Sequence, residues 1–436
     1  MQLLTCTALP QRLATVTSVT QWQALARQVG FCRRLPRKIQ PFTFLWGLCL
    51  WALQPTASLR MAAACLGLCA GTTISKQGVD KRFTPQAVAF VQQALGAVMA
   101  RLAQRRAGLT ATAFAAFGRV LLHDSTTVAL AAKLAARFPG NANGRGQPLA
   151  LAKIQCVYEL LSERFVWWRL TSFRVNDQTA ARDLLALVQP RDLVVRDLGY
   201  FSLAGLRQLA ERRAFFLSRL WLGLKVFSTD GAPPFDLLGA LQHNGWLDVD
   251  VRLGTNEKLP VRLVAVAVPE AVANERRRKA RQNRDRRAPV SAKRLVLLGW
   301  DIFITNVGRE QWSAKTVGQV YGVRWRIEIV FKSWKSHFRL EAVPDGDGPQ
   351  VELLLWARLL LVTLLHGWLA VAAAGSDPPL SLLKVAEFVA AWGVALLVGP
   401  LAAELPQRWY EQMRYHCRYE RRRKRFNFPE KLAMLG

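Results

Sequence analysis

Acidic side chains are scarce in this chain. Its 436 residues include 30 aspartates and glutamates against 60 lysines and arginines, a formal charge of +30 at pH 7. Such an excess repels itself unless a polyanion neutralises it, so nucleic acid is the first partner to expect and an anionic membrane surface the second. The length exceeds the usual span of one domain, so we expect two or three.

Metal-binding and disulfide patterns are lacking as well. The five histidines are scattered and show no zinc-ligand spacing. The seven cysteines are an odd set, and the closest pair, Cys65 and Cys69, lies in an apolar helical stretch, which argues against a disulfide framework. The first residues lack the charged leader and apolar core of a secretory signal, so we expect a reduced, cytosolic protein.

Uninterrupted apolar runs of membrane-spanning length are also rare. Residues 351–374 are long enough to span a bilayer, but Glu352, Arg358 and His366 interrupt them. Residues 44–72 contain a proline, an arginine and small polar residues, and the basic residues show no loop bias that would set a topology. We therefore predict two buried helices and no membrane partner, with a polytopic membrane protein as an alternative.

The hydrophobic patterns that are present predict a mixed α/β fold. Residues 1–115 have helical spacing, after which the chain changes to short apolar runs such as RVLLHDSTTV, LALAKIQCVYELL and FVWWRLTSFRV. Turn-prone segments separate these runs, so three neighbouring, antiparallel strands are expected. A helix, the buried strand in DLVVRDLGYFS, a second helix from about Ser202 and a strand at AFFLSRL follow.

The remaining patterns divide the chain into three regions. Residues 249–268 predict a hairpin that turns at 255–258, RLVLLGWDIFITNV predicts a further strand, and helical spacing returns from Ser313. The expected regions are a helical DNA-binding region at 1–115, a catalytic region at 116–345 with a β-rich insertion at about 222–296, and a helical region with a basic tail at 346–436.

Four polar residues mark the segment YGVRWRIEIVFKSWK. They are Tyr321, Arg324, Glu328 and Lys335, with the spacing Y-x2-R-x3-E-x6-K. On one continuous helix they fall within an arc of about 60°, beside the apolar stripe. The glutamate is then expected at the edge of a buried face, next to two cations and a phenol that suit a phosphate group. The ordinary alternative is a surface helix with an Arg324–Glu328 ion pair.

This spacing resembles the signature of bacterial insertion-sequence DDE transposases, in the family called after insertion sequence four. That family places one aspartate in a strand-end segment like LLHDSTTV and a second in one like VVRDLGYF, which nominates Asp124 and Asp197. The resemblance covers about residues 119–340, in the family's order, with a β-rich insertion between the second and third acids. It implies a ribonuclease-H-like core flanked by helical N- and C-terminal regions.

A two-metal site is the main implication of this resemblance. Asp124, Asp197 and Glu328 would be the catalytic residues and the ligands of two Mg²⁺ ions, for which Mn²⁺ can substitute. The chemistry itself asks for such ligands, because in-line attack on a phosphodiester builds charge on the entering and leaving oxygens, and Mg²⁺ prefers oxygen ligands. Taken alone, an aspartate at a strand end is more often a turn or cap residue. The two aspartates therefore count only jointly with Glu328.

Further residues near the motif are assigned to DNA contacts or to structure. By resemblance, Tyr321, Arg324 and Lys335 contact the DNA backbone near the cleaved end. Trp300 stands 28 residues before the glutamate of the motif and resembles a family tryptophan that stacks on a flipped base, although tryptophan in an apolar strand is ordinarily part of the core. Strand alternation turns His123 away from the acids, so we interpret it as structural.

Two basic runs, at 275–287 and 418–426, complete the set of candidates. Such runs are usually solvated faces, but with a nucleic-acid partner they become surfaces that follow the phosphates. The candidate DNA-binding residues of the first run are Arg276, Arg277, Arg278 and Lys279. Asp177, in RVNDQTAARDLL, is interpreted as a residue that starts a helix and not as a fourth acid.

The expected protein is thus a bacterial transposase of the cytoplasm and nucleoid. It would bind the terminal inverted repeats of its element, cleave the ends and transfer 3′-OH strands to target DNA, by analogy as a dimer on paired DNA ends. A catalytically inactive DNA-binding relative and a ribonuclease-H-like nuclease without strand transfer are the alternatives, and the presence of all three acids argues against the first. The sequence specifies neither the repeat and target sequences nor whether excision uses hairpin ends, and no helix-turn-helix marks the helix that reads DNA.

Overall fold

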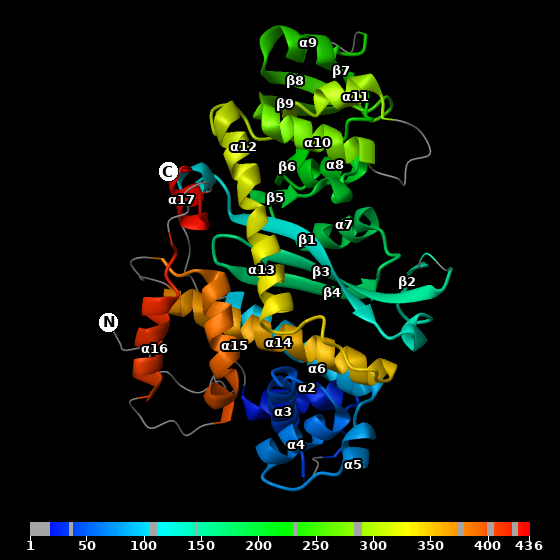
Figure 1. The fold of residues 1–436 in the computed structure, drawn as a ribbon, viewed down its shortest axis with the longest axis vertical. Helices are drawn as coiled ribbons and strands as arrows, with labels where there is room; N and C mark the ends of the chain where they lie inside the picture. The colour runs from blue at the N-terminus through cyan, green and yellow to red at the C-terminus, as the bar shows by residue number, and fades with distance from the viewer. Residues whose placement is uncertain are drawn as a thin grey trace. The chain divides into compact units, whose positions relative to one another are not determined.

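The computed structural model describes residues 18–34, 38–103, 111–142, 144, 146–229, 233–282, 290–373, 379–398, 405–420 and 426–436 (Figure 1). The chain divides into two compact units, each made of three separate segments. Unit 1 comprises Met1–Leu109, Ser125–Val175 and Ile327–Arg425, and unit 2 comprises Thr110–Asp124, Asn176–Arg326 and Phe426–Gly436. The three consecutive regions expected from the sequence stay a prediction, because functional regions need not coincide with packing units.

The first segment of unit 1 is helical, as its apolar spacing predicts. Ser18 starts the first described helix with a capping box, accepting from the backbone N–H of Gln21. Ser58 caps another helix, which ends at Gly71 in the left-handed conformation, with φ of 63°. These helices are α2 (Val19–Gln28), α3 (Pro41–Ala52), α4 (Leu59–Ala70), α5 (Lys76–Asp80) and α6 (Pro85–Ala103).

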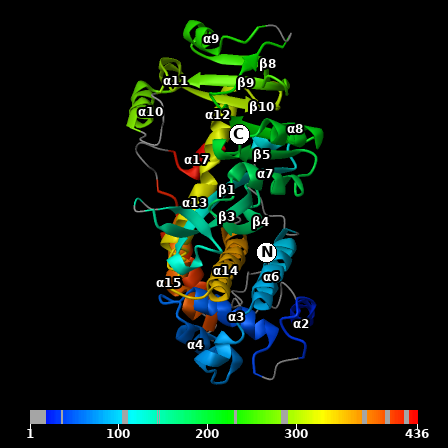
Figure 2. The same ribbon diagram turned by 90° about the vertical axis from the view of Figure 1, so that its right-hand side faces the viewer.

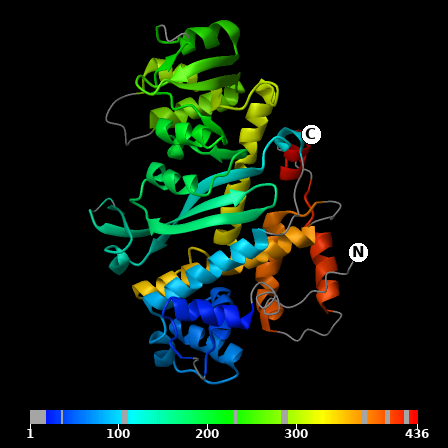
Figure 3. The ribbon, with the colours of Figure 1, turned by 180° about the vertical axis from the view of Figure 1, so that it is seen from behind.

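The long apolar helix α14 (Gly348–Ala373) forms the core of unit 1. By length and composition its part Gly348–Gly367 is able to cross a membrane, with mean hydropathy 1.4, yet 89% of that apolar window is buried inside the protein. The helix packs along α6 and against α3 (Figure 3). The prediction of a buried helix is therefore confirmed for this stretch, whereas residues 44–72, predicted as one helix, fall in two helices, α3 and α4.

Polar residues inside α14 have partners that explain their burial. Glu352 forms an ion pair with Arg137. The buried guanidinium of Arg358 donates to the carbonyl oxygens of Leu340, at 3.3 Å, and Ala342, at 2.9 Å, and burial lowers its pKa to about 10. Because buried polar groups are costly unless bonded, these contacts hold α14 in one position against its own unit.

Unit 1 also contains an antiparallel layer. Its strands are β2 (Pro139–Ala142), β3 (Pro148–Glu159) and β4 (Arg164–Ser172), with β3 between the other two. β3 is also bonded to β1 (Arg119–Leu130), which crosses from unit 2 into unit 1 at Ser125. The three strands expected from the sequence are confirmed as β1, β3 and β4. The expected turn before β3 forms the extra strand β2, because its backbone pairs with the start of β3. The C-terminal segment of unit 1 also contains α15 (Leu382–Val398) and α16 (Leu405–His416).

Unit 2 is built on a mixed sheet with the strand order β1-β5-β6-β10-β9-β8-β7. The β1–β5 and β5–β6 pairs are parallel, and the remaining pairs are antiparallel, with β8, β9 and β10 side by side in Figure 2. The strands are β5 (Asp192–Arg196), β6 (Phe215–Arg219), β7 (Val226–Phe227), β8 (Leu247–Leu253), β9 (Leu259–Ala267) and β10 (Trp300–Thr305). The predicted mixed α/β class is therefore confirmed.

Helices and short turns connect these strands. α8 follows β5 and leads to β6, the kind of crossover that parallel neighbours need. The helices of unit 2 are α7 (Asp177–Leu185), α8 (Leu203–Glu211), α9 (Leu237–Asn244), α10 (Glu270–Gln282), α11 (Ala292–Leu297), α12 (Ala314–Val323) and α17 (Phe428–Ala433). The 3₁₀ turns of the chain are η1 (Thr112–Phe114), η2 (Ala132–Leu134) and η3 (Leu198–Tyr200).

Two sequence predictions in unit 2 have different outcomes. The hairpin is confirmed, since β8 pairs with β9 from Leu247 opposite Ala265 to Leu253 opposite Leu259. The strand predicted for RLVLLGWDIFITNV is wrong in its first half, which forms α11. Ser291 caps that helix by accepting from the backbone N–H of Arg294, and this cap wins over the β-propensity of the apolar run.

The last described segment of the chain belongs to unit 2. Thr112 and Ala113, before β1, donate backbone hydrogen bonds to the carbonyls of Gly436 and Leu435. The ring of Phe428 in α17 lies 4.3 Å from the buried guanidinium of Arg326. Most of the basic tail predicted at 418–426 lies outside the described residues.

Candidate active site

The ladder between β1 and β5 brings two aspartates together. It pairs Arg119 with Asp192 at one end and His123 with Arg196 at the other. Asp124 and Asp197 are the next residues along the two strands, and adjacent strands lie about 4.8 Å apart. β5 is buried along its whole length, so Asp197 becomes accessible only where that strand ends.

One guanidinium spans both aspartates. Arg324 Nη1 lies 3.1 Å from Asp124 Oδ2, and Arg324 Nη2 lies 3.9 Å from Asp197 Oδ1. The side chains of Arg324 and Asp124 are 9% and 18% exposed, whereas that of Asp197 is 48% exposed. The cluster is thus closed around Asp124 and open to solvent at Asp197.

Tyr321 forms a wall beside this cluster. Its ring centroid lies 5.0 Å from that of Phe303, and the guanidinium carbons of Arg219 and Arg324 lie 5.6 and 5.8 Å from it. Burial raises the pKa of Tyr321 to about 12, the carboxylate of Asp197 acting in the same direction and the two arginines in the opposite one. The phenol therefore keeps its proton at ordinary pH and can donate a hydrogen bond.

The predicted single helix from Ser313 is divided at Arg324. α12 ends at Val323 and α13 (Trp325–Ser336) begins after the arginine, whose backbone keeps right-handed helical angles of φ −50° and ψ −35°. The prediction of one uninterrupted helix is therefore wrong at Arg324, where the helical hydrogen-bond pattern is interrupted although the backbone angles stay helical. The interruption falls on the residue whose side chain is committed to the two aspartates.

Glu328 and Lys335 belong to α13. Glu328 is partly buried in the first turn, where the partial positive charge of a helix N-terminus favours a carboxylate. Lys335, in the last turn, lies 2.7 Å from Glu341 Oε1. Among the described residues, no group of three or more histidine, cysteine, aspartate or glutamate side chains is gathered closely enough to hold a metal ion.

Trp300, the predicted stacking residue, is the first residue of β10 and is partly exposed. Its indole Nε1 donates to the carbonyl oxygen of Gly245 at 2.9 Å. Side chains alternate along a strand, so Trp300 lies on the face of the sheet opposite Phe303 and hence opposite Tyr321. The stacking role of Trp300 stays a prediction.

A second tryptophan, which the sequence analysis did not single out, faces the Tyr321 side. Trp246 is 57% exposed and lines a pocket of about 440 Å³ together with Phe303, Lys315 and Gln319. Trp325, beside Arg324, is 55% exposed, and its ring lies 5.9 Å from that guanidinium carbon. Both tryptophans are candidate site residues because their rings are exposed. The exposure of a side chain cannot be read from the sequence.

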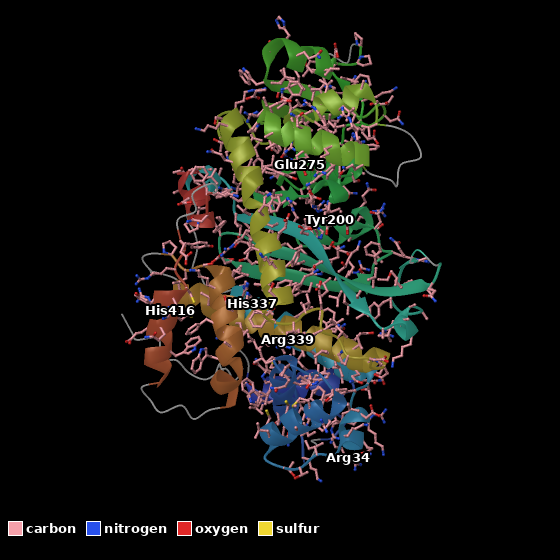
Figure 4. All side chains as sticks on the ribbon, viewed as in Figure 1. Arg34, Tyr200, Glu275, His337, Arg339 and His416 are labelled. Carbon is pink, nitrogen blue, oxygen red and sulfur yellow. The ribbon has the colours of Figure 1, made fainter. Side chains whose placement is uncertain are left out.

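The candidate DNA-binding residues of the first basic run lie on α10, where Glu275 is labelled in Figure 4. All four have carboxylate partners. Arg276 pairs with Asp301 at 2.8 Å, Arg277 with Glu270 at 2.7 Å, and Arg278 and Lys279 with Glu275 at 2.8 and 3.4 Å. Hydrogen bonds from Arg278 lower the pKa of Glu275 to about 2, so its charge persists at any ordinary pH. α10 carries five basic and two acidic residues, so its net charge stays positive. Residues 283–287 of the basic run lie outside the described residues.

His123 and Asp177, which the sequence assigns to structural roles, lie in a buried strand and at a helix start. His123 is fully buried, and its ring lies 4.2 Å from that of Tyr200. Asp177 is the first residue of α7, directly after the N-cap Asn176, as predicted. In the described part of the chain the cysteines are unpaired as disulfides, in agreement with the sequence.

Comparison with known proteins identifies the family of this chain. Residues 115–364 match the family described as the transposase DDE domain, and these residues are more than half of the chain. The chain therefore belongs to the DDE transposase family, and its relatives are transposases of insertion sequences. The family resemblance stated from the sequence is confirmed.

Three relatives show how far the similarity extends. The transposase of IS231B from Bacillus thuringiensis subsp. berliner is 29% identical over 362 residues, which cover 78% of this chain and 75% of the relative. The transposase of IS1151 from Clostridium perfringens is 25% identical over 329 residues, 71% of this chain and 69% of the relative. The putative transposase InsL of IS186A from Escherichia coli strain K12 is 29% identical over 210 residues, 45% and 56% of the two chains.

Proposed function

We propose that this transposase binds the terminal inverted repeats of its insertion sequence, cleaves the ends and transfers the 3′-OH strands to target DNA by two-metal phosphoryl transfer. The proposal rests above all on one contact, the approach of the Arg324 guanidinium to both Asp124 and Asp197. Two carboxylates that one cation reaches together supply oxygen ligands of the kind that a metal-dependent phosphoryl transfer uses.

Asp124 and Asp197 are the first two proposed ligands of a divalent metal ion. They offer carboxylate oxygens, which Mg²⁺ and Mn²⁺ accept, and a single positively charged group already reaches both. Glu328 is the proposed third ligand. Two bound Mg²⁺ ions would supply stabilisation of the charge on the attacking and leaving oxygens of the phosphodiester.

The residues around the acids have their own proposed tasks. The protonated phenol of Tyr321 donates a hydrogen bond to a phosphate oxygen, because its pKa of about 12 keeps it neutral. The guanidinium of Arg324 has the planar fork that binds phosphate with two hydrogen bonds. Lys335 contributes a point charge once a phosphate competes with Glu341. These groups orient the cleaved end of the DNA.

We infer a ribonuclease-H-like core from the strand pattern. In unit 2, β1, β5 and β6 are parallel neighbours, and in unit 1, β3 is bonded to β1 and lies antiparallel to β4. The β-rich insertion then corresponds to the antiparallel strands β7 to β9 with α9 to α11. This order supports the inference, since Asp124 lies within β1 and Asp197 directly follows β5, its parallel neighbour.

Double-stranded DNA is the proposed partner, and a dimer on paired ends is the proposed assembly. The formal charge of +30 and the positive face of α10 support the partner. The dimer rests on analogy with the family. We propose the bacterial cytoplasm, at the nucleoid, as the place of action, because relatives are transposases of bacterial insertion sequences.

A strand-transfer assay tests the proposed function. Purified protein is incubated in Mg²⁺ with a duplex that ends in the element's terminal repeat and with a supercoiled plasmid. Cleavage at the repeat followed by joining of its 3′-OH end to the plasmid is expected. Cleavage without joining would indicate a nuclease, and specific binding without cleavage would indicate an inactive relative.

A further inference from the structure

Arg324 holds the positive charge that the two aspartates would otherwise receive from a metal ion. Its two terminal nitrogens point to different carboxylates, at 3.1 Å to Asp124 and 3.9 Å to Asp197. The contact joins positions 200 residues apart, so the fold and not local sequence creates it. A guanidinium keeps its charge throughout the ordinary pH range.

Aromatic rings hold this guanidinium in place. The ring of Tyr321 lies 5.8 Å and that of Trp325 5.9 Å from its central carbon, both within the range of cation–π attraction. Both belong to unit 2, as do Asp124 and Asp197. The cluster is therefore assembled within one unit.

We propose that Arg324 is a lock on metal loading. In the absence of DNA it neutralises Asp124 and Asp197 and opposes the entry of a divalent cation. A DNA phosphate can accept two hydrogen bonds from the guanidinium and so competes with the aspartates for it. When the guanidinium moves to the phosphate, the two adjacent carboxylates are left with a net negative charge. The affinity for metal ions then rises when DNA binds. By thermodynamic linkage, bound metal raises the affinity for DNA by the same factor. This inference rests on the proposed function, because it takes the aspartates as metal ligands.

The lock has a physical purpose in this reaction. A transposase that carried its metal ions continuously would be ready to cut any phosphodiester that reached Asp197, the most exposed of the three residues. With the arginine in the way, the hydrolytic site is complete only after a phosphate has been bound beside it. Arg324 thus controls the access of metal ions, in addition to its proposed contact with DNA.

Manganese binding to the DNA-free, full-length protein tests the lock without any measurement of activity. Free Mn²⁺ is counted by electron paramagnetic resonance for the parent protein and for Arg324→Gln, Arg324→Lys, Asp124→Asn and Asp197→Asn. We expect Arg324→Gln to bind Mn²⁺ about tenfold more tightly than the parent, because an opposite charge at this distance shifts a carboxylate's affinity for cations by at least that factor. Arg324→Lys keeps the charge and should stay close to the parent.

Two further variants make the result specific. The double variant Asp124→Asn/Arg324→Gln should lose the gain, since the carboxylate that profits is gone. Arg309→Gln is the matched control, because it removes the arginine partner of an exposed carboxylate, Asp250, that is not a proposed ligand, and it should bind like the parent. Thermal melting in the absence of metal ensures that only folded variants are compared.

The outcomes separate the lock from the proposed function. If Asp124→Asn and Asp197→Asn weaken Mn²⁺ binding while Arg324→Gln leaves it unchanged or weaker, the lock is overturned and the metal site stands. If neither aspartate variant alters Mn²⁺ binding, the aspartates are not metal ligands, and the two-metal proposal and the lock are both overturned.

Discussion

His123 lies opposite Arg196 at the last step of the parallel ladder between β1 and β5. Neither residue is proposed to act on DNA, yet their pairing sets the positions of Asp124 and Asp197, which follow them. A slip of this register by one residue would turn one aspartate toward the other face of the sheet. The geometry of the acids is therefore a property of the buried ladder, to which the Arg119–Asp192 ion pair contributes at its opposite end.

Neutral replacement of the arginines on α10 should weaken the salt dependence of DNA binding. Exchanging Arg276, Arg277, Arg278 and Arg281 for Gln is expected to reduce the slope of log K against log salt by about 0.9 for each residue that contacts a phosphate. The preferred repeat sequence should not change, since these residues are proposed to touch only the backbone. Titrations at several salt concentrations give the slope, and an unchanged slope would remove α10 from the DNA interface.

Glu275→Gln should have the opposite effect. It removes the carboxylate that pairs with Arg278 and Lys279, so both cations become available to phosphate. Because exposed ion pairs are weak, DNA binding at low salt is expected to tighten by no more than about fivefold. Glu257→Gln, at another surface position of unit 2, is the control. Weaker binding by Glu275→Gln would show that the helix acts by another route.

The two tryptophans of unit 2 can be told apart by kinetics. If Trp300 stacks on a flipped base during hairpin formation, Trp300→Ala should slow that step and spare the first nick, with a loss of about 1–3 kcal/mol per stacked base. An abasic nucleotide at the flipped position should then rescue much of the loss. If the base enters the pocket beside Phe303, the same pattern should appear with Trp246→Ala. Uniform loss at every step with a lower melting temperature would leave Trp300 as a packing residue.

Asp248 makes the stability of unit 2 sensitive to acid. Hydrogen bonds from the buried guanidinium of Arg262, at 2.8 and 2.7 Å, hold the pKa of Asp248 below its usual value. A carboxyl whose folded pKa is lowered stabilises the fold above its unfolded pKa of about 3.9, and this contribution disappears as the pH falls through the folded pKa. The free energy of unfolding should therefore decline below about pH 4.

Asp248→Asn tests this contribution directly. It leaves the buried Arg262 without its carboxylate and should cost roughly 3–5 kcal/mol at neutral pH, while flattening the acid dependence. Asp250→Asn removes an exposed pair with Arg309 and should cost about 1 kcal/mol or less. Chemical denaturation across pH provides the comparison, and equal losses in both variants would contradict the role of the buried pair.

The sequence predicts much of this fold because local patterns coincide with it. Alternating apolar residues mark β8 and β9, and helical spacing marks the N-terminal helices. The division of the helix at Arg324 was not predictable, because it accompanies contacts with aspartates far away in the sequence. The placement of the last residues beside Thr112 is also a long-range contact, which no periodicity reports.

The sequence could indicate which residues belong to the candidate site, but not which ion pairs they form. Spacing and resemblance single out Asp124, Asp197 and Arg324, but only the structure brings the arginine between the two acids. The carboxylate partners of the α10 cations are likewise partly local and partly distant, since Glu275 lies on α10 and Asp301 on β10. The exposure of Trp246 depends on the packing of the whole insertion.

Cleavage of a terminal-repeat duplex in Mg²⁺ by Asp124→Ala, Asp197→Ala and Glu328→Ala tests the central claim most directly. Each variant should lose at least about 100-fold in cleavage rate, because each removes a ligand of the proposed metal ions, while gel-shift affinity for the same duplex stays close to that of the parent. Mn²⁺ should replace Mg²⁺ in the parent, and Ca²⁺ should support binding with little cleavage. Near-normal cleavage by any one of the three folded variants would contradict the account of these residues as the metal-binding acids.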